Sequence, residues 1–210
     1  ISSTSMNRIF ITGIGTDVGK TVVAAIVTEA LQADYWKPIQ SGLEETDRGT
    51  IQSLITNNKT VIHPEAYRLK TPMSPHKSAQ IDGIDIELDK IIRPKTNNIL
   101  VIEGVGGLLV PLNNSQTIAD LIEKDDQVIL VSSGYLGSIN HTLLTAESLK
   151  NRGLNCIGII YNHVELDGTI EIIEKMTELK TLGILNRETS INAEIVQKYA
   201  QLFREDLLEL

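Results

Sequence analysis

The chain has 210 residues, of which 41% are hydrophobic, and this length and composition predict one folded domain with a substantial core. The 19 Lys and Arg residues against 27 Asp and Glu residues give a formal net charge of -8, which disfavours nucleic acids and anionic membranes as partners. Cys156 is the only cysteine, which excludes an intramolecular disulfide and a cysteine-cluster metal site and favours a cytoplasmic location. The longest apolar stretch, 99–112, is interrupted by Glu103 and glycines, so no transmembrane segment is expected.

Residues 1–5 precede Met6 and are short, uncharged and without the apolar core of a signal peptide. We interpret them as a remnant of cloning and Met6 as the natural start. The predicted domain therefore covers residues 6–210.

Short β-rich apolar runs alternate along the chain with longer segments of helical period. This alternation predicts an α/β fold, in which a mostly parallel, doubly wound sheet is flanked by helices. The expected strands are 8–12, 35–37, 99–103, 127–132, 156–162 and 181–185. The expected helices are 20–32, 49–56, 117–123, 140–151, 169–178 and 192–204. Residues 59–95 are rich in proline and polar residues and show no clear period.

A glycine-rich segment, Gly13-Ile-Gly-Thr-Asp-Val-Gly-Lys-Thr21, joins the first expected strand to the first expected helix. In a P-loop, glycines let backbone N–H groups surround phosphate oxygens, the lysine reaches the β and γ oxygens, and the final hydroxyl binds Mg²⁺. The first glycine of the regular motif would fall at Ile14, so this loop is a variant. An ordinary glycine turn before a helix is the alternative. The strand, loop and helix context favours a nucleotide triphosphate site in a P-loop NTPase fold.

Two further charged residues are expected at the same edge of the sheet. Glu103 follows the apolar run 99–102, and its carboxylate suits a Mg²⁺ ligand, direct or through water. Lys37 follows the second expected strand, where it would meet a developing negative charge. The alternative for each is a strand-end charge in water. P-loops serve kinases, ligases, GTPases and motor ATPases, so these residues leave the reaction open.

The chain resembles the dethiobiotin synthetases, the ATP-dependent carboxylases of biotin synthesis, in several segments that occur in the same order. They are the loop 13–21, Lys37-Pro-x-x-Ser-Gly42, Asp47, Pro72-Met-Ser-Pro-His76, Glu103-Gly-Val-Gly-Gly107, Leu136-Gly-Ser-Ile-Asn-His141 and Asn162. Each segment is weak alone, and their joint, ordered occurrence is specific.

The resemblance implies an ATP- and Mg²⁺-dependent cyclo-ligase. Its substrates would be 7,8-diaminononanoate and CO₂ or bicarbonate. One amine would take up CO₂ as a carbamate, the carbamate would attack the γ-phosphate, and the resulting carbamic-phosphoric anhydride would be closed by the neighbouring amine to give dethiobiotin. For such chemistry the protein mainly has to position the reactants and neutralise their charge.

The resemblance also implies roles for individual residues. Lys20 and Lys37 are the expected catalytic residues, the first at the β and γ phosphates and the second at the carbamate and transferred phosphoryl group. The expected metal ligands are Thr21, Asp47 and Glu103. The expected nucleotide contacts are Asp17, Val18, Gly19, Lys20, Thr21, Val22, Asp47, Glu103, Gly104, Val105, Gly106 and Asn162. The expected substrate contacts are Thr16, Lys37, Ser41, Gly137, Ser138, Ile139 and Asn140.

Two of these expectations have plain alternatives. Asn162 would hydrogen-bond the adenine ring because its amide both donates and accepts, although a turn-forming asparagine is the other interpretation.

Residues 136–141 open an expected helix whose free N–H groups would bind a carboxylate. In the family this segment reaches the substrate tail across a homodimer interface, which implies a homodimer with shared sites. His141 is equally consistent with a neighbour of the helix cap, and we assign it no role.

The chain departs from the family at three positions. Gly15 and Tyr135 stand where other members often carry polar or charged residues, and Asn186 stands where proline is common near the adenine.

Two other P-loop classes remain as alternatives. An amidoligase usually carries an attached glutaminase domain. A partition-type switch ATPase carries a second lysine near the start of the loop, where this chain has Gly15.

Overall fold

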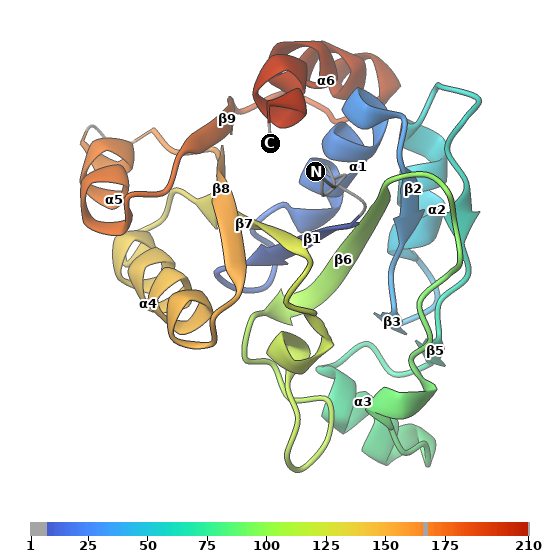
Figure 1. The fold of residues 1–210 in the computed structure, drawn as a ribbon. Coiled ribbons are helices and arrows are strands. Elements are labelled where there is room, and N and C mark those ends of the chain that lie inside the picture. Colours follow the sequence, from blue (N-terminus) through green and yellow to red (C-terminus); the bar gives the residue numbers. More distant parts are fainter. Residues whose placement is uncertain (1–7, 166–167, 210) are drawn as a thin grey trace, which may run out of the picture.

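The computed structural model describes residues 8–165 and 168–209, and every statement below concerns those residues. A seven-stranded parallel sheet forms the middle of the fold, in the order β4-β2-β6-β1-β7-β8-β9 (Figure 1). Its strands are β1 (Arg8–Gly13), β2 (Asp34–Trp36), β4 (Ile62–His63), β6 (Leu100–Gly107), β7 (Gln127–Ser133), β8 (Asn155–Asn162) and β9 (Thr181–Leu185). A separate parallel pair is formed by β3 (Ile39–Ser41) and β5 (Tyr67–Leu69).

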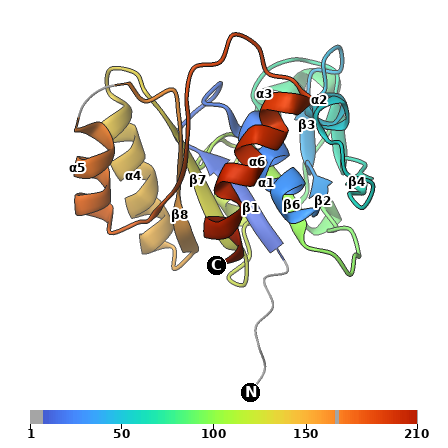
Figure 2. The same ribbon diagram turned by 90° about the horizontal axis from the view of Figure 1, so that it is seen from above.

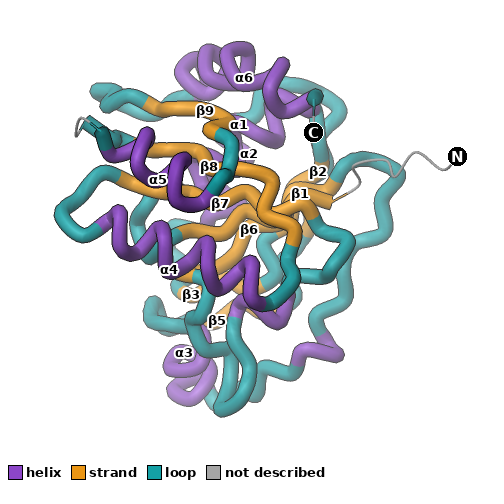
Figure 3. Tube along the Cα trace, turned by 60° about the vertical axis from the view of Figure 1, so that its left-hand side comes forward, coloured by secondary structure: helices purple, strands orange, loops and turns teal. Residues whose placement is uncertain are grey.

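Helices cover both faces of the sheet. One face carries α1 (Lys20–Leu31), α2 (Asp47–Leu54) and α6 (Ala193–Leu208), and the other carries α4 (Ser138–Asn151) and α5 (Thr169–Thr177), as Figures 2 and 3 show from two sides. Near the end of β3 lies α3 (Pro75–Asp82), and two short 3-10 helices are η1 (Leu88–Lys90) and η2 (Ile118–Leu121). The expected helix-flanked parallel sheet is therefore confirmed.

Alternation along the strands explains the two faces of the core. Ile9 and Ile11 of β1 pack beneath α1 and α6, whereas Phe10 between them faces the opposite side, against Ile102 and Ile118. Successive side chains of a strand point to opposite faces, so a strand buried on both faces is apolar throughout. None of the described helices has the length and apolar character needed to cross a bilayer.

Two local expectations were wrong. In place of the helix expected at 117–123, the structure has the short 3-10 helix η2, and the backbone is already extended at Ile122, with ψ 121°. The next N–H, of Glu123, donates to the Asp126 carboxylate at 2.8 Å. Residues 59–95 hold the short elements β4, β5, α3 and η1, although their sequence shows no clear period. The strand expected to end at Glu103 continues to Gly107, so Glu103 lies inside β6. The other expected elements differ from the observed ones by a few residues at their ends.

The strand order brings together the groups that the sequence places far apart. Because β6 lies between β1 and β2, the ends of these three strands are neighbours at one edge of the sheet. The loop after β1, Lys37 after β2 and Glu103 in β6 therefore meet at this edge. Ligand sites of parallel α/β sheets form at the carboxyl ends of the strands.

Candidate functional site

The P-loop, residues 13–21, runs from the last residue of β1 to the first two residues of α1. Gly19 caps the helix in the left-handed conformation, with φ 98°, and a Cβ there would lie 2.2 Å from Nδ2 of Asn162. Glycine is thus required at this position by both the backbone and its neighbour. The first turn of α1 leaves N–H groups without intrahelical partners, which suits an anion at this end.

The Lys20 side chain folds back over the loop. Its Nζ donates a hydrogen bond to the Gly15 carbonyl at 2.8 Å, and the residue is 8% exposed. Burial lowers the pKa of Lys20 to about 8, and the opposing effect of the nearby Glu103 carboxylate is too small to offset it. A phosphate bound in the loop would place a negative charge beside Lys20 and so stabilise its ammonium form.

Glu103 is the centre of a buried polar network. Its Oε1 accepts from the Thr21 hydroxyl at 2.7 Å and lies 3.3 Å from Nζ of Lys37. Its Oε2 accepts from the Tyr35 hydroxyl at 2.6 Å. The residue is 1% exposed, so its charge depends on these protein donors rather than on water.

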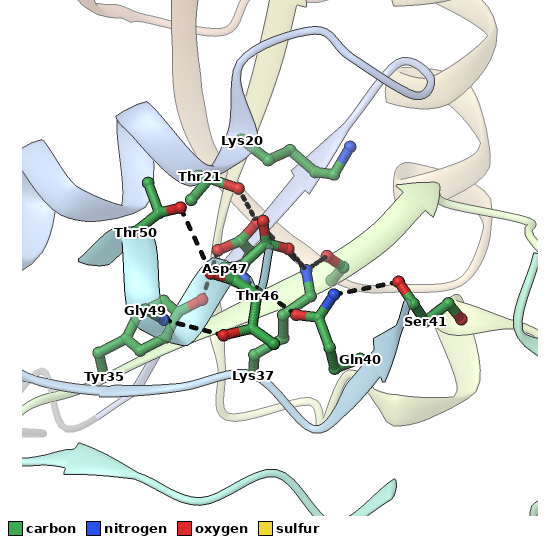
Figure 4. A network of polar contacts seen from close by, with 12 residues as sticks. Lys20, Thr21, Tyr35, Lys37, Gln40, Ser41, Thr46, Asp47, Gly49 and Thr50 are labelled. Carbon is green, nitrogen blue, oxygen red and sulfur yellow. Dashed lines mark hydrogen bonds and ion pairs between the residues drawn. The ribbon is translucent and has the colours of Figure 1, made fainter. Parts of the chain in front are cut away.

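Lys37 lies between two carboxylates. Its Nζ is 2.6 Å from Oδ2 of Asp47 and also donates to the Gly104 carbonyl at 3.2 Å (Figure 4). Burial alone would lower the pKa of Lys37, but Glu103 and Asp47 outweigh it and raise the pKa above its ordinary value. Burial and the Glu103 charge raise the pKa of Tyr35 well above its ordinary value. Lys37 therefore stays a cation and Tyr35 a hydrogen-bond donor.

The segment after Lys37 is joined to the start of α2 by Gln40. Its Nε2 donates to the Ser41 carbonyl at 3.1 Å, and its Oε1 accepts from the Asp47 N–H at 3.0 Å (Figure 4). Thr46 caps the same helix by accepting from the Gly49 N–H. The Ser41 hydroxyl is buried and has no hydrogen-bond partner within the described part of the chain.

These groups surround a cavity of about 690 Å³. Twelve of the residues expected in the site line it: Thr16, Asp17, Gly19, Lys20, Thr21, Val22, Lys37, Ser41, Asp47, Glu103, Val105 and Gly106. Sequence reasoning missed Tyr35 and Gln40. Gln40 lies inside the Lys37–Gly42 motif, and this position could have identified it as a site residue. Tyr35 lies in an apolar strand, and its sequence context indicates only a core residue.

Other expected site residues lie outside the lining. Val18 is buried beneath the loop, and Asn162 ends β8 with Nδ2 donating to the Val18 carbonyl at 3.0 Å. Asn162 thus lies in a strand, where it supports the P-loop. Gly104 lies in β6 and contributes its carbonyl to Lys37. Gly137 caps α4 and residues 138–140 form its first turn, and none of them lines the cavity of their own chain.

The donor atoms at this edge fit Mg²⁺. Thr21, Asp47 and Glu103 provide one hydroxyl and two carboxylates, which are the hard oxygen ligands that this ion prefers. Over residues 8–165 and 168–209, no group of three or more His, Cys, Asp or Glu side chains forms a metal cage. A site with few protein ligands suits Mg²⁺, which keeps waters and binds substrate phosphates.

The fold and the loop define a P-loop nucleotide-binding protein. Solved structures with the same arrangement include septum site-determining protein MinD complexed with Mg-ADP from Pyrococcus horikoshii, with 16% identity and a TM-score of 0.63 over 97% of this chain and 95% of that one. A ParA family ATPase from Chlorobium tepidum has 12% identity and a TM-score of 0.57, over 98% and 93%. At such identities the likeness shows the fold alone.

Sequence comparison is more specific. A family model described as an AAA domain matches residues 7–195. The ATP-dependent dethiobiotin synthetase BioD of Christiangramia forsetii is 54% identical over 96% of this chain and 98% of its own length. The same enzyme of Cytophaga hutchinsonii is 53% identical, over 93% and 96%, and that of Agrobacterium fabrum is 42% identical, over 97% and 98%. The chain belongs to the ATP-dependent dethiobiotin synthetase family.

Proposed function

We propose that this chain closes 7,8-diaminononanoate and CO₂ to dethiobiotin at the cavity beside Glu103, with ATP as the driving co-substrate. Membership of the synthetase family supports the overall reaction. One observation carries the assignment of the site: the buried cations Lys20 and Lys37 converge with the buried Glu103 next to the P-loop. Phosphoryl transfer needs this combination of positioning and charge neutralisation.

The nucleotide would lie along the P-loop. Backbone N–H groups of residues 17–22 would surround its phosphates, and Lys20 would move from the Gly15 carbonyl to the β and γ oxygens. Asn162 would contact the adenine from the end of β8. Its hydrogen bond to Val18 places it next to the loop, which supports this role.

Lys37 would hold the acceptor. The carbamate oxygen attacks the γ phosphorus, the bond to the ADP oxygen breaks, and negative charge grows on the transferred group. The second amine then attacks the carbamate carbon and phosphate leaves, which gives the cyclic urea. Because Lys37 is already desolvated and oriented by Asp47 and Glu103, it can meet this charge without reorganising.

Mg²⁺ would be held by Thr21, Asp47 and Glu103. When bound, the ion supplies charge neutralisation for the nucleotide phosphates. The protein's own contribution is the arrangement of these three oxygen donors on α1, α2 and β6.

The diamine would lie at the other end of the cavity, against Ser41 and Thr16. The buried Ser41 hydroxyl supports this, since a substrate amine would supply the partner that the described protein does not. Residues 137–140 would bind the substrate carboxylate from the second subunit of a homodimer. The 99% exposure of Leu136 beside them supports an interface there.

Phosphate release from ATP tests the proposal. Release in the presence of Mg²⁺ and bicarbonate should require 7,8-diaminononanoate, and product should form in equal amounts. ATP hydrolysis that is indifferent to the diamine, but stimulated by DNA or lipid, would contradict the proposal.

A further inference from the structure

We infer that Tyr35 is a positioning residue for the reaction: its hydroxyl orients the Glu103 carboxylate so that Oε1 faces Thr21 and Lys37. The inference rests on the proposed function, because that function assigns Glu103 to the magnesium site. Tyr35 does not line the cavity, so it would act only through Glu103.

The sheet register explains why a tyrosine reaches this carboxylate. Tyr35 of β2 lies opposite Val101 of β6, and Glu103 stands two residues further along β6. Side chains two residues apart share a face of the strand, so the Tyr35 ring and the Glu103 carboxylate lie on the same side of the sheet. The ring is fully buried in the core beneath α1, and only its hydroxyl extends to the network.

The two carboxylate oxygens of Glu103 have unequal surroundings. Oε1 has the Thr21 hydroxyl and the Lys37 ammonium, whereas the hydrogen bond recorded at Oε2 comes from Tyr35. At 1% exposure, little water reaches the carboxylate to compensate for a lost donor. Without the Tyr35 hydroxyl, the carboxylate would gain by rotating toward the remaining donors, and Oε1 would leave its position beside Thr21.

Metal sites depend on such outer contacts. Removing a residue that hydrogen-bonds a metal ligand typically weakens metal affinity by about 10–100-fold. Phenylalanine at position 35 would keep the buried ring and remove only the hydroxyl. The substitution Tyr35→Phe therefore isolates the proposed contact from the packing of the core.

The test is a titration of the full chain with Mn²⁺ as a probe for the magnesium site, in the presence of saturating ADP, followed by electron paramagnetic resonance. In Tyr35→Phe we expect the Kd for Mn²⁺ to rise about tenfold. The Kd for ADP without metal should stay within about twofold. The matched control is Tyr161→Phe, which removes a hydroxyl from another fully buried ring, in β8, and should leave the Kd for Mn²⁺ unchanged.

A variant pair keeps the test decisive even if Tyr35→Phe is unstable. In the Glu103→Gln background, Tyr35→Phe no longer leaves a buried charged oxygen without a hydrogen-bond donor. The decreases in Tm and in Mn²⁺ affinity that Tyr35→Phe causes should therefore both be smaller in this background than in wild type. Equal losses in both backgrounds would overturn the inference, as would an unchanged Kd for Mn²⁺ in Tyr35→Phe. If wild-type protein with ADP binds no Mn²⁺, the proposed metal site itself fails, which is a distinguishable result.

Discussion

Lys37 and Asp47 form an ion pair with 2.6 Å between Nζ and Oδ2, which ties the first residue of α2 to the end of β2. The Lys37 side chain is 5% exposed and that of Asp47 31%, so one partner is desolvated while the other still reaches solvent. Glu103 and the Gly104 carbonyl hold the same ammonium from β6. The cation is thus oriented by the fold before any substrate arrives, which is the condition for effective charge stabilisation.

The substitution Lys37→Ala should abolish most turnover while nucleotide still binds. We expect kcat to fall about 10²–10³-fold, since a preorganised charge at the transferred group is lost, and the Kd for ATP to change little. Steady-state phosphate release and calorimetric ATP binding measure the two effects. The control is Lys180→Ala, whose ion pair with Asp206 lies on the exposed surface. Unchanged kcat in Lys37→Ala would remove this residue from the mechanism.

The substitution Lys20→Ala should weaken nucleotide binding as well as turnover. A charge-assisted hydrogen bond to phosphate contributes about 1.5–3 kcal/mol, so the Kd for ATP should rise roughly 10–100-fold. Calorimetry with ATP and with adenosine separates the phosphate contribution, because adenosine affinity should not change. Equal weakening for both ligands would mean that the loop had lost its conformation.

The substitution Gln40→Ala should act on substrate binding more than on the chemical step. It removes two neutral hydrogen bonds that join Ser41 to the start of α2, each worth about 1 kcal/mol. We expect the KM for the diamine to rise about fivefold, with a smaller change in kcat. Gln52→Ala, at an exposed position of the same helix, is the control and should have wild-type kinetics. A fall in kcat at constant KM would contradict the expected role.

Asp34 should make stability depend on pH in acid. Although burial opposes its charge, hydrogen bonds from His63, Thr96, Asn98 and the Val61 N–H lower the pKa of this carboxyl. A lowered folded-state pKa contributes stability above the unfolded-state value, near 3.9, and loses it as the pH falls through the folded-state value. Asp34→Asn should therefore cost about 2 kcal/mol at pH 7.

Urea unfolding of wild type and Asp34→Asn from pH 7 to pH 3 measures this difference. The gap between the two proteins should narrow below pH 4, because the Asp34 carboxyl then becomes protonated in the unfolded state before it does so in the folded state. Asp89→Asn, at an exposed position of η1, is the control and should match wild type throughout. A gap that stays constant down to pH 3 would show that charge at Asp34 is not the source of the difference.

The proposed homodimer should be sensitive to Leu136. This side chain is 99% exposed beside the residues expected to complete the neighbouring site. Leu136→Asp should yield monomers by light scattering and raise the KM for the diamine, because burying an unpaired carboxylate in an interface is costly. Leu202→Asp, at a 63% exposed position of α6, should leave mass and kinetics unchanged. A fully active monomer would contradict the shared site.

Features that depend on neighbouring residues could be predicted from the amino-acid sequence. The P-loop is readable because its glycines, Lys20 and Thr21 are consecutive, and each requirement is met within a few residues of backbone. The parallel sheet is readable because its strands are continuous apolar runs separated by helical periods. The family followed from the order of several such local segments.

Which distant residues meet depends on how the strands pair and the helices pack. Tyr35 and Glu103 are 68 positions apart, and their contact depends on the register of β2 against β6. Gln40 and Asp47 are only seven positions apart, yet their hydrogen bond depends on the path of the loop that joins β3 to α2. The short elements of residues 59–95 are stabilised by pairing and packing rather than by their own periodicity, so their sequence carried no signal. A periodic pattern reports burial of one face, whereas register and strand order follow from the packing of the whole chain.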